Sequence, residues 1–375
     1  MRSVKLISLF SSLLLLTGCW DQTQLNETKL VRAAGFDYLK NGKIINSASI
    51  PQSVNTDTGT GQVNNQIFHA VGNTARQSRI KLDRKVSEKV DASKNLVVIL
   101  GEEAARKDIY HILDVFYRDP KSALNARIAV AKGNASDVLS ARFEETETSI
   151  GVGTYLSESI RSAEDAAIVP VENIQTVCPI MFDPGQDFAL PYLVPEKNAV
   201  SVNGIAVFHG NKMVGTINGA QGVLFTLLTG KQKNRSMSLT RKISNKHKDR
   251  ILNYVSIKVK RNKRTFNVNV SPDDKISAHI TLNMSVVITE YPGDNLTSKK
   301  KINKIEHDLT KSLTKEANNV LKKLQDMNSD AFGVGRKLIA FHNPTWKKLN
   351  WNKEYPNIDY TASVKVKVIG HGIIE

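Results

Sequence analysis

The residue whose chemistry can be named most directly from the sequence is Cys19. It directly follows Leu16-Thr17-Gly18. Before this tripeptide come a short basic start, with Arg2 and Lys5, and an apolar run of eleven residues that is interrupted only by serines. A basic start, an apolar centre and small residues at the end are typical of a secretory signal. We therefore expect this segment to direct the chain out of the cytoplasm.

The tetrad that ends in Cys19 resembles the lipobox of bacterial lipoproteins. In that class the cysteine sulfur receives a diacylglycerol, the chain is cut before the cysteine, and the new amino group is often acylated. The alternative is a transmembrane anchor, but eleven apolar residues fall short of the roughly 20 that cross a bilayer. We expect residues 1–18 to be a cleaved signal peptide and Cys19 to carry S-diacylglycerol and N-acyl chains, which together hold a protein stably on a membrane.

The formal net charge of +16 falls to +14 when Arg2 and Lys5 leave with the signal peptide. Much of the excess lies between residues 231 and 275, where fourteen Lys or Arg face three Asp. A secreted, lipid-anchored chain is not expected to meet nucleic acid, whereas anionic lipid head groups attract basic residues by about 1 kcal/mol each. A solvated basic segment without a specific partner is the alternative. The candidate lipid contacts are Arg241, Lys242, Lys246, Lys248, Lys260, Arg261, Lys263 and Arg264.

Signatures of catalysis, metal binding and nucleotide binding are absent from the sequence. It contains no P-loop, no nucleophile elbow, no H-E-x-x-H and no clustered Cys and His, and Gly151-Val152-Gly153 lacks the rest of a dinucleotide fingerprint. The second cysteine, Cys178, has no base or ligand partner at a useful spacing and is predicted to be a buried structural thiol. We expect no enzyme activity, no cofactor and no metal.

Residues 31–38 and 44–50 alternate as strands around an Asn41-Gly42 turn, which predicts a hairpin. Pro51 should stop the second strand and 56–65 should form a loop. The spacing then predicts a helix within 68–90, a buried strand at 95–100, a helix at 102–116 and a strand at 127–131. Strand, helix and strand in this order are typical of a parallel βαβ unit. A further helix is predicted at 154–163, and 170–195 shows little periodicity.

The second half begins with a predicted hairpin at 202–217 and a helix at 221–228 that ends at Gly230. Alternating runs at 251–260, 265–270 and 275–291 predict antiparallel strands. A long amphipathic helix at 301–327 should cover their sheet, and 360–369 should form a closing strand. The expected fold is α+β, with an α/β-containing N-terminal domain followed by an antiparallel sheet packed by the long helix. Three domains are expected, at 19–198, 199–235 and 236–375.

The start Gly18-Cys19-Trp20-Asp21 resembles the N-terminus of the C-subunit lipoproteins of nutrient germinant receptors in endospore-forming bacteria. The resemblance covers almost the whole mature chain. The chain departs from the family pattern at Thr216-Ile217, where Trp-Leu is common. The other segments that carry the resemblance are Leu25-Asn26-Glu27, Ala34-Gly35-Phe36-Asp37, Val97 to Glu103, Tyr117 to Pro120, Ile128 to Gly133 and Asn203 to Gly215.

The resemblance implies a non-enzymatic lipoprotein on the outer face of the spore inner membrane. It implies that the protein works with two polytopic membrane partners, the A and B subunits, in the response of a dormant spore to nutrients. The family fold is α+β in three domains, and no ligand-binding residue is carried over. The alternative function is a solute-binding lipoprotein that delivers a small ligand to a transporter, although such proteins usually have two similar α/β lobes.

Overall fold

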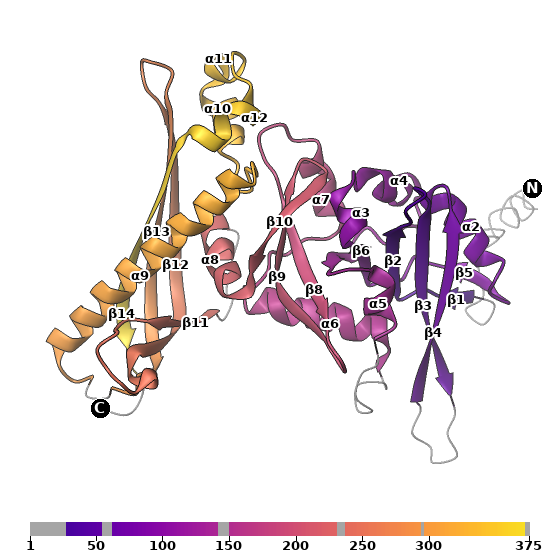
Figure 1. The fold of residues 1–375 in the computed structure, drawn as a ribbon, viewed down its shortest axis with the longest axis horizontal. Coiled ribbons are helices and arrows are strands. Elements are labelled where there is room, and N and C mark those ends of the chain that lie inside the picture. Colours follow the sequence, from indigo (N-terminus) through magenta and orange to yellow (C-terminus); the bar gives the residue numbers. More distant parts are fainter. Residues whose placement is uncertain (1–27, 55–61, 142–149, 231–236, 294–295, 372–375) are drawn as a thin grey trace, which may run out of the picture.

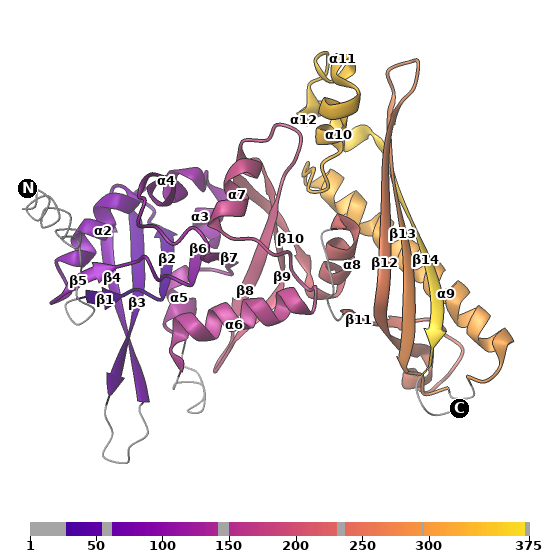
Figure 2. The same cartoon turned by 180° about the vertical axis from the view of Figure 1, so that it is seen from behind.

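The computed structural model of the chain describes residues 28–54, 62–141, 150–230, 237–293 and 296–371. The predicted signal peptide at 1–18 and the predicted lipidation site Cys19 lie outside these residues. Figure 1 shows the described chain laid out along one long axis, with its first strands at one end and its last strands at the other. Figure 2 shows the same order from behind.

Eight strands form the largest sheet, in the order β10-β9-β8-β7-β6-β2-β3-β4. The four neighbours β2, β6, β7 and β8 run parallel, and the strands outside them pair antiparallel. The bounds are β2 (Ala33–Tyr38), β3 (Ile44–Val54), β4 (Gln62–Gly72), β6 (Val97–Gly101), β7 (Arg127–Ala131), β8 (Ala189–Pro195), β9 (Val200–His209) and β10 (Lys212–Asn218). A separate parallel pair joins β1 (Thr28–Leu30) to β5 (Lys89–Asp91).

The predicted first hairpin and the predicted βαβ unit are both confirmed. β2 pairs antiparallel with β3, and Gly42 in their connection has a φ of 79°, a conformation that glycine adopts at little cost. β6 pairs parallel with β7. The residues between them form two helices, α3 (Glu102–Arg106) and α4 (Tyr110–Arg118), where the sequence predicted one.

The predicted end of the second strand at Pro51 is wrong, and the loop predicted at 56–65 is wrong at residues 62–65, which belong to β4. Residues 56–61 of that predicted loop lie outside the described residues. β3 continues to Val54, and β4 pairs with it from residue 62 to residue 72. β2 reaches only Ser49 of β3, so Pro51 has a strand neighbour on one side alone, a position that tolerates its missing N–H. The helix predicted within 68–90 is confirmed as α2, which begins at Ala75 after the cap at Thr74.

Helices cover both faces of the large sheet. Val98 and Leu100 of β6 pack on one side and Val97 and Ile99 on the other, which explains the continuous apolar run that predicted a strand buried on both faces. The first face carries α2 (Ala75–Asp83), α3, α4 and α7 (Ile174–Met181), and the second carries α5 (Ala135–Leu139) and α6 (Val152–Asp165). α7 and β8 lie in the segment for which the sequence predicted no element.

Asp37 at the end of β2 fixes the start of α5. Its Oδ1 accepts a hydrogen bond from the Ala135 N–H at 2.7 Å, and its Oδ2 accepts one from the Ser136 N–H at 3.0 Å. A Cβ at Gly101 of the neighbouring strand would lie 2.0 Å from the Asp37 Oδ1. The carboxylate can reach the helix because position 101 has no side chain.

The second large element is a four-stranded sheet in the order β11-β12-β13-β14, which packs against the long helix α9 (Lys299–Asp326). The α+β fold and the long helix are confirmed. The wholly antiparallel arrangement is wrong at its last strand, because β14 pairs parallel with β13. Helical segments return the chain to the end where β13 began, as a parallel pair requires. The strands are β11 (Met237–Lys242), β12 (Tyr254–Val270), β13 (Ile276–Glu290) and β14 (Asp359–Gly370), with short helices η3 (Arg250–Asn253), α10 (Val334–Phe341), α11 (Asn343–Trp346), α12 (Trp351–Glu354) and η4 (Tyr355–Asn357).

The helix α8 (Gly219–Thr229) lies between the two sheets (Figures 1 and 2). Its apolar residues belong to one continuous core with Ile205 and Val207 of β9 and with Ile280 and Leu282 of β13. Gly230 ends α8 in the left-handed conformation, as predicted. β9 and β10 are strands of the large sheet, which therefore runs across the boundary predicted at residue 198. The division into three domains stays a prediction.

Candidate functional site

The basic residues predicted to contact lipid belong to two groups with different surroundings. Six of them have exposed side chains and lie in the β11–β12 connection, at the end of β11 or in the middle of β12. These six are Lys242, Lys246, Lys248, Lys260, Arg261 and Lys263. In Figure 1 the β11–β12 connection lies at one end of the four-stranded sheet, the same end at which β14 ends.

The other two, Arg241 and Arg264, are held by contacts within the chain. The Arg241 Nε lies 2.7 Å from the Glu316 Oε2 of α9, and the exposed fraction of the Arg241 side chain is 11%. The Arg264 guanidinium lies 4.5 Å from the centre of the Phe266 ring, and burial lowers its pKa. Arg241 therefore joins β11 to α9, and Arg264 packs on the Phe266 ring, so neither side chain is free at the surface.

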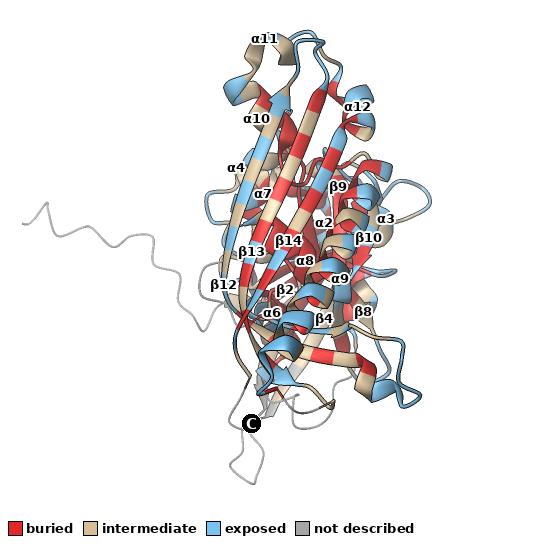
Figure 3. Ribbon diagram, turned by 90° about the vertical axis from the view of Figure 1, so that its left-hand side faces the viewer, coloured by how far each residue is buried: buried red, intermediate tan, exposed pale blue. Residues whose placement is uncertain are grey.

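Two exposed lysines that were not predicted as lipid contacts, Lys365 and Lys367, join the exposed basic group. On β14, Lys365 pairs with Asn283 of β13, and Asn283 in turn pairs with Lys263 of β12. Lys367 lies two residues further along β14 on the same face, beside Arg261 and Ser285, and together these residues line a shallow, open hollow. Figure 3 shows the alternation of buried and exposed residues along the strands. The alternating Val-Lys-Val-Lys-Val at 364–368 was the signal that could have found them.

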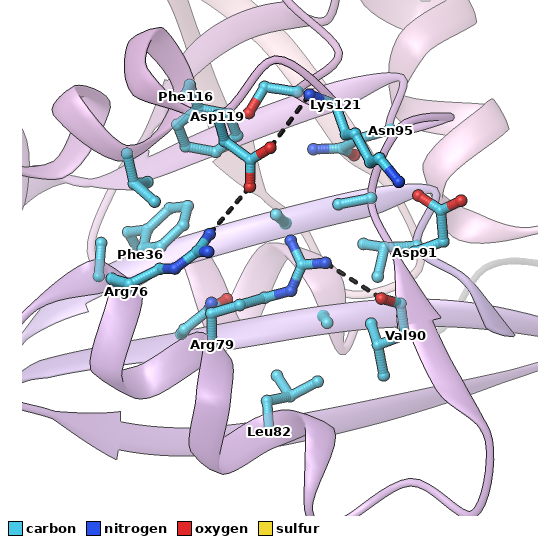
Figure 4. A pocket seen from close by; sticks show the side chains of 18 of the residues that line it. Phe36, Arg76, Arg79, Leu82, Val90, Asp91, Asn95, Phe116, Asp119 and Lys121 are labelled. Carbon is cyan, nitrogen blue, oxygen red and sulfur yellow. Dashed lines mark hydrogen bonds and ion pairs between the residues drawn. The ribbon is translucent and has the colours of Figure 1, made fainter. Parts of the chain in front are cut away.

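A more enclosed pocket lies in the first half of the chain, on the face of the large sheet that carries α2 and α4 (Figure 4). Its volume is about 150 Å³. Ala34 of β2 and Ala48 of β3 are register partners at its floor, and their small side chains leave the space open. Phe36 and Phe116 form an apolar wall, with ring centres 5.9 Å apart and an edge-to-face geometry.

Charged and amide side chains line the rest of this pocket. Arg79 of α2 donates from Nη2 to the Val90 carbonyl at 3.1 Å, and Arg76 pairs with Asp119 at 2.8 Å. Asn46 and Asn95 lie among the lining residues and are 5% and 3% exposed. None of these residues was a predicted site residue, because they are far apart in the chain and form no motif.

A buried carboxylate pair joins the large sheet to the segment after α9. The backbone N–H of Asp330 donates to the Asp187 Oδ2 at 2.7 Å, and the Trp351 Nε1 donates to the Asp330 Oδ2 at 3.2 Å. Burial raises the pKa of the Asp330 carboxyl to about 8, while N–H donors at Val334, Gly335 and Trp351 oppose that rise. Hydrogen bonding to Asp187 raises the pKa of His209, and burial opposes this. This arrangement ties two distant parts of the chain together.

Cys178 lies in α7 and is half-buried with a free thiol, so the prediction of a buried thiol is wrong. Within the described residues, no group of three or more His, Cys, Asp or Glu is placed to hold a metal ion. None of the helices in the described part of the chain is both long enough and apolar enough to cross a membrane.

Two family models match the chain, and the first match ends with β8 while the second begins within β9, both strands of the large sheet. Residues 21–195 match the family model of the spore germination protein N-terminal domain, and residues 203–372 match that of the spore germination B3/GerAC-like C-terminal domain. The spore germination protein GerQC of Bacillus cereus is 25% identical over 96% of both chains. The spore germination protein B3 of Bacillus subtilis is 22% identical over 98% of this chain and 97% of its own length.

A solved structure shares the fold. The crystal structure of the GerBC protein matches 93% of this chain and 100% of its own with a TM-score of 0.55, at 16% sequence identity. The two family models together cover nearly all of the described residues. The chain therefore belongs to the spore germination proteins of the germinant receptor C-subunit family.

Proposed function

We propose that this chain is a lipid-anchored, non-enzymatic subunit of a spore germinant receptor. The observation that carries the anchoring is Cys19 directly after Leu16-Thr17-Gly18, at the end of a short signal-like segment. Membership of the spore germination family supports the role in germination. In this proposal the protein lies on the outer face of the spore inner membrane and acts through contacts with the polytopic A and B subunits.

The chain offers a matched control for the anchor, because it contains two cysteines. Cys19→Ala should abolish incorporation of labelled fatty acid and release the protein from the membrane fraction. Cys178→Ala should leave both properties unchanged, because that thiol lies within the folded chain. Full membrane retention of the Cys19→Ala protein, with no acyl label, would contradict the proposed anchor.

The receptor complex is tested separately. The tagged lipoprotein should be recovered from detergent-solubilised spore membranes together with two polytopic membrane proteins. Cys19→Ala should reduce this recovery in whole spores, because loss of the anchor lowers the local concentration at the membrane. If the wild-type protein is recovered from solubilised dormant spores without any polytopic protein, the receptor part of the proposal is wrong.

We further propose that the exposed basic residues contact anionic lipid. The proposal leaves out Arg241 and Arg264, whose side chains pack within the chain. It uses the exposed residues Lys242, Lys246, Lys248, Lys260, Arg261, Lys263, Lys365 and Lys367. Each basic residue close to such a surface contributes about 1 kcal/mol, and salt screens this attraction. Binding of the unlipidated full chain to anionic vesicles should therefore fall as salt rises.

Charge reversal tests which basic residues are used. The double variant Lys263→Glu with Lys365→Glu should weaken binding to anionic vesicles. Lys40→Glu with Lys43→Glu makes the same change of charge in the exposed turn of the first hairpin and should leave binding close to that of the wild type. Equal loss in both variants, or equal binding to neutral and anionic vesicles, would remove the proposed lipid contact.

A further inference from the structure

Two buried asparagines line the pocket on the first face of the large sheet, and amide atoms of both side chains lack hydrogen-bond partners among the described residues. No described group forms a hydrogen bond with the Oδ1 or the Nδ2 of Asn95, and none forms one with the Oδ1 of Asn46. Both side chains are more than nine-tenths buried and line the pocket. An unsatisfied buried polar group costs about 1–3 kcal/mol, so these amides are placed where a polar molecule would complete their bonding.

The charged groups of the pocket indicate which molecule would fit. Figure 4 shows the Arg79 guanidinium between α2 and the Val90–Asp91 segment, with Asn95 and Lys121 among the other side chains that line the pocket. Of the guanidinium nitrogens of Arg79, only Nη2 has a backbone partner among the described residues, the Val90 carbonyl. The Arg79 Nε lies 3.7 Å from the Asp83 Oδ1. A guanidinium with donors to spare recognises a carboxylate. Asp91 supplies a negative charge among the residues that line the pocket.

The apolar part of the pocket limits the size of the ligand. Ala34 and Ala48 at the floor and Phe116 at the wall accept a short hydrocarbon group. The volume of about 150 Å³ lies below the roughly 300–1,000 Å³ of pockets that take drug-sized ligands. The site is therefore suited to a molecule of a few carbon atoms.

We propose that this pocket binds a small solute with one carboxylate, which Arg79 holds while Asn95 and Asn46 hydrogen-bond to a polar substituent beside it. The short hydrocarbon part packs against Ala48 and Phe116. This site is separate from the lipid anchor and from the basic face of the second sheet, so it stands whether or not those proposals hold.

A matched series of three-carbon probes tests the proposal on the purified full-length lipoprotein in detergent. Propionate, L-lactate and L-alanine share the carboxylate and differ at the second carbon in carrying hydrogen, hydroxyl or ammonium. L-alaninamide replaces the carboxylate of L-alanine by an amide. At least one of the three carboxylates should raise the melting temperature at millimolar concentration, and L-alaninamide should not. Absence of a shift with all three carboxylates, or an equal shift with L-alaninamide, overturns the proposal.

Substitutions locate the binding in the pocket. Arg79→Gln and Asn95→Ala should each weaken the affinity for the active probe at least about tenfold, which corresponds to 1.4 kcal/mol. Arg84→Gln changes an exposed arginine just after α2 and should bind like the wild type. Ala48→Val should also reduce the affinity for the active probe, because the larger side chain fills space at the floor of the pocket. This variant keeps the polar groups of the pocket unchanged. Wild-type affinity in both Arg79→Gln and Ala48→Val would show that any binding lies elsewhere.

Discussion

At the scale of single residues, Asp37 shows how a short sequence motif acts across the fold. Its carboxylate caps α5 through two backbone N–H groups, and Gly35 two residues earlier lets the same helix approach, because a Cβ there would lie 3.1 Å from the Ala135 Cβ. Burial raises the pKa of Asp37, and the two N–H donors oppose this. The segment 34–37 thus positions a helix that lies almost a hundred residues later.

Asp37→Ala should lower the free energy of unfolding by about 1–3 kcal/mol, because the buried N–H of Ala135 and the partly buried N–H of Ser136 lose their acceptor. Urea denaturation of the purified chain measures this change. Asp165→Ala, at the exposed end of α6, should change stability by less than about 0.5 kcal/mol. A loss in Asp37→Ala no larger than in Asp165→Ala would contradict the capping role.

His209 should give the chain a measurable pH dependence of stability. Its ring Nδ1 lies 3.3 Å from the Asp187 Oδ2, and this contact raises its pKa above the ordinary 6.5. A raised histidine pKa means that the stabilisation is fully present below pH 6.5 and is lost as the pH rises through the folded-state pKa. The difference in unfolding free energy between the wild type and His209→Gln should therefore be larger in mildly acidic than in alkaline buffer. A constant or opposite difference would exclude this contribution.

At the scale of elements, α9 takes the place of a missing strand beside β14. Four of its side chains, spaced four residues apart, bond to backbone groups spaced two residues apart along β14. One helical repeat of four residues rises about 6 Å and two strand residues rise about 6.7 Å, so the two rows stay in step. The pairs are Glu306 with Val368, Thr310 with Val366, Thr314 with Val364, and Asn318 with Ala362.

This row of bonds closes an edge that would otherwise be open to pairing with another chain. Asn318 bonds to both the N–H and the carbonyl of Ala362. Asn318→Ala should lower the free energy of unfolding by about 1–3 kcal/mol and should increase aggregation during refolding. The adjacent Asn319 is exposed, so Asn319→Ala is the control and should change neither property. Equal behaviour of the two variants in denaturation and light scattering would contradict the role of this row.

The sequence predicted those elements whose structure depends mainly on residues that are close in the chain. Asn41-Gly42 predicted the hairpin, and the apolar stripe of 301–327 predicted α9. β4 was missed because polar residues such as Asn64, Asn65 and His69 hide its alternation, and its strand state depends on pairing along β3. The direction of β14 depends on where the helices return the chain. The pocket was not predictable, because only the tertiary fold brings Asn46 and Asn95 to one cavity.

At the scale of the molecule, the long shape limits how the proposed anchor at Cys19 and the basic face can meet one membrane. The first described strand, β1, is at one end of the long axis, and β12–β14 are at the other (Figures 1 and 2). Cys19 precedes Thr28 by nine residues, which reach at most about 30 Å when fully extended. A molecule that stands upright on this tether would hold its basic residues away from the bilayer. Both contacts are made together only when the long axis lies along the membrane.

We expect the charge of the lipid to decide how close the basic face of the lipidated protein lies to a liposome surface. A fluorophore on Lys246→Cys in a Cys178→Ala background should be quenched by a head-group quencher in anionic liposomes and much less in neutral ones. A label on Asn41→Cys, in the exposed turn of the first hairpin, reports on the anchored end and should differ less between the two lipids, because the tether rather than charge holds that end near the bilayer. Adding Lys263→Glu and Lys365→Glu should lower quenching at position 246 alone. Equal quenching at position 246 in both lipids would mean that charge does not set the orientation, and the basic face would then be available to a protein partner instead.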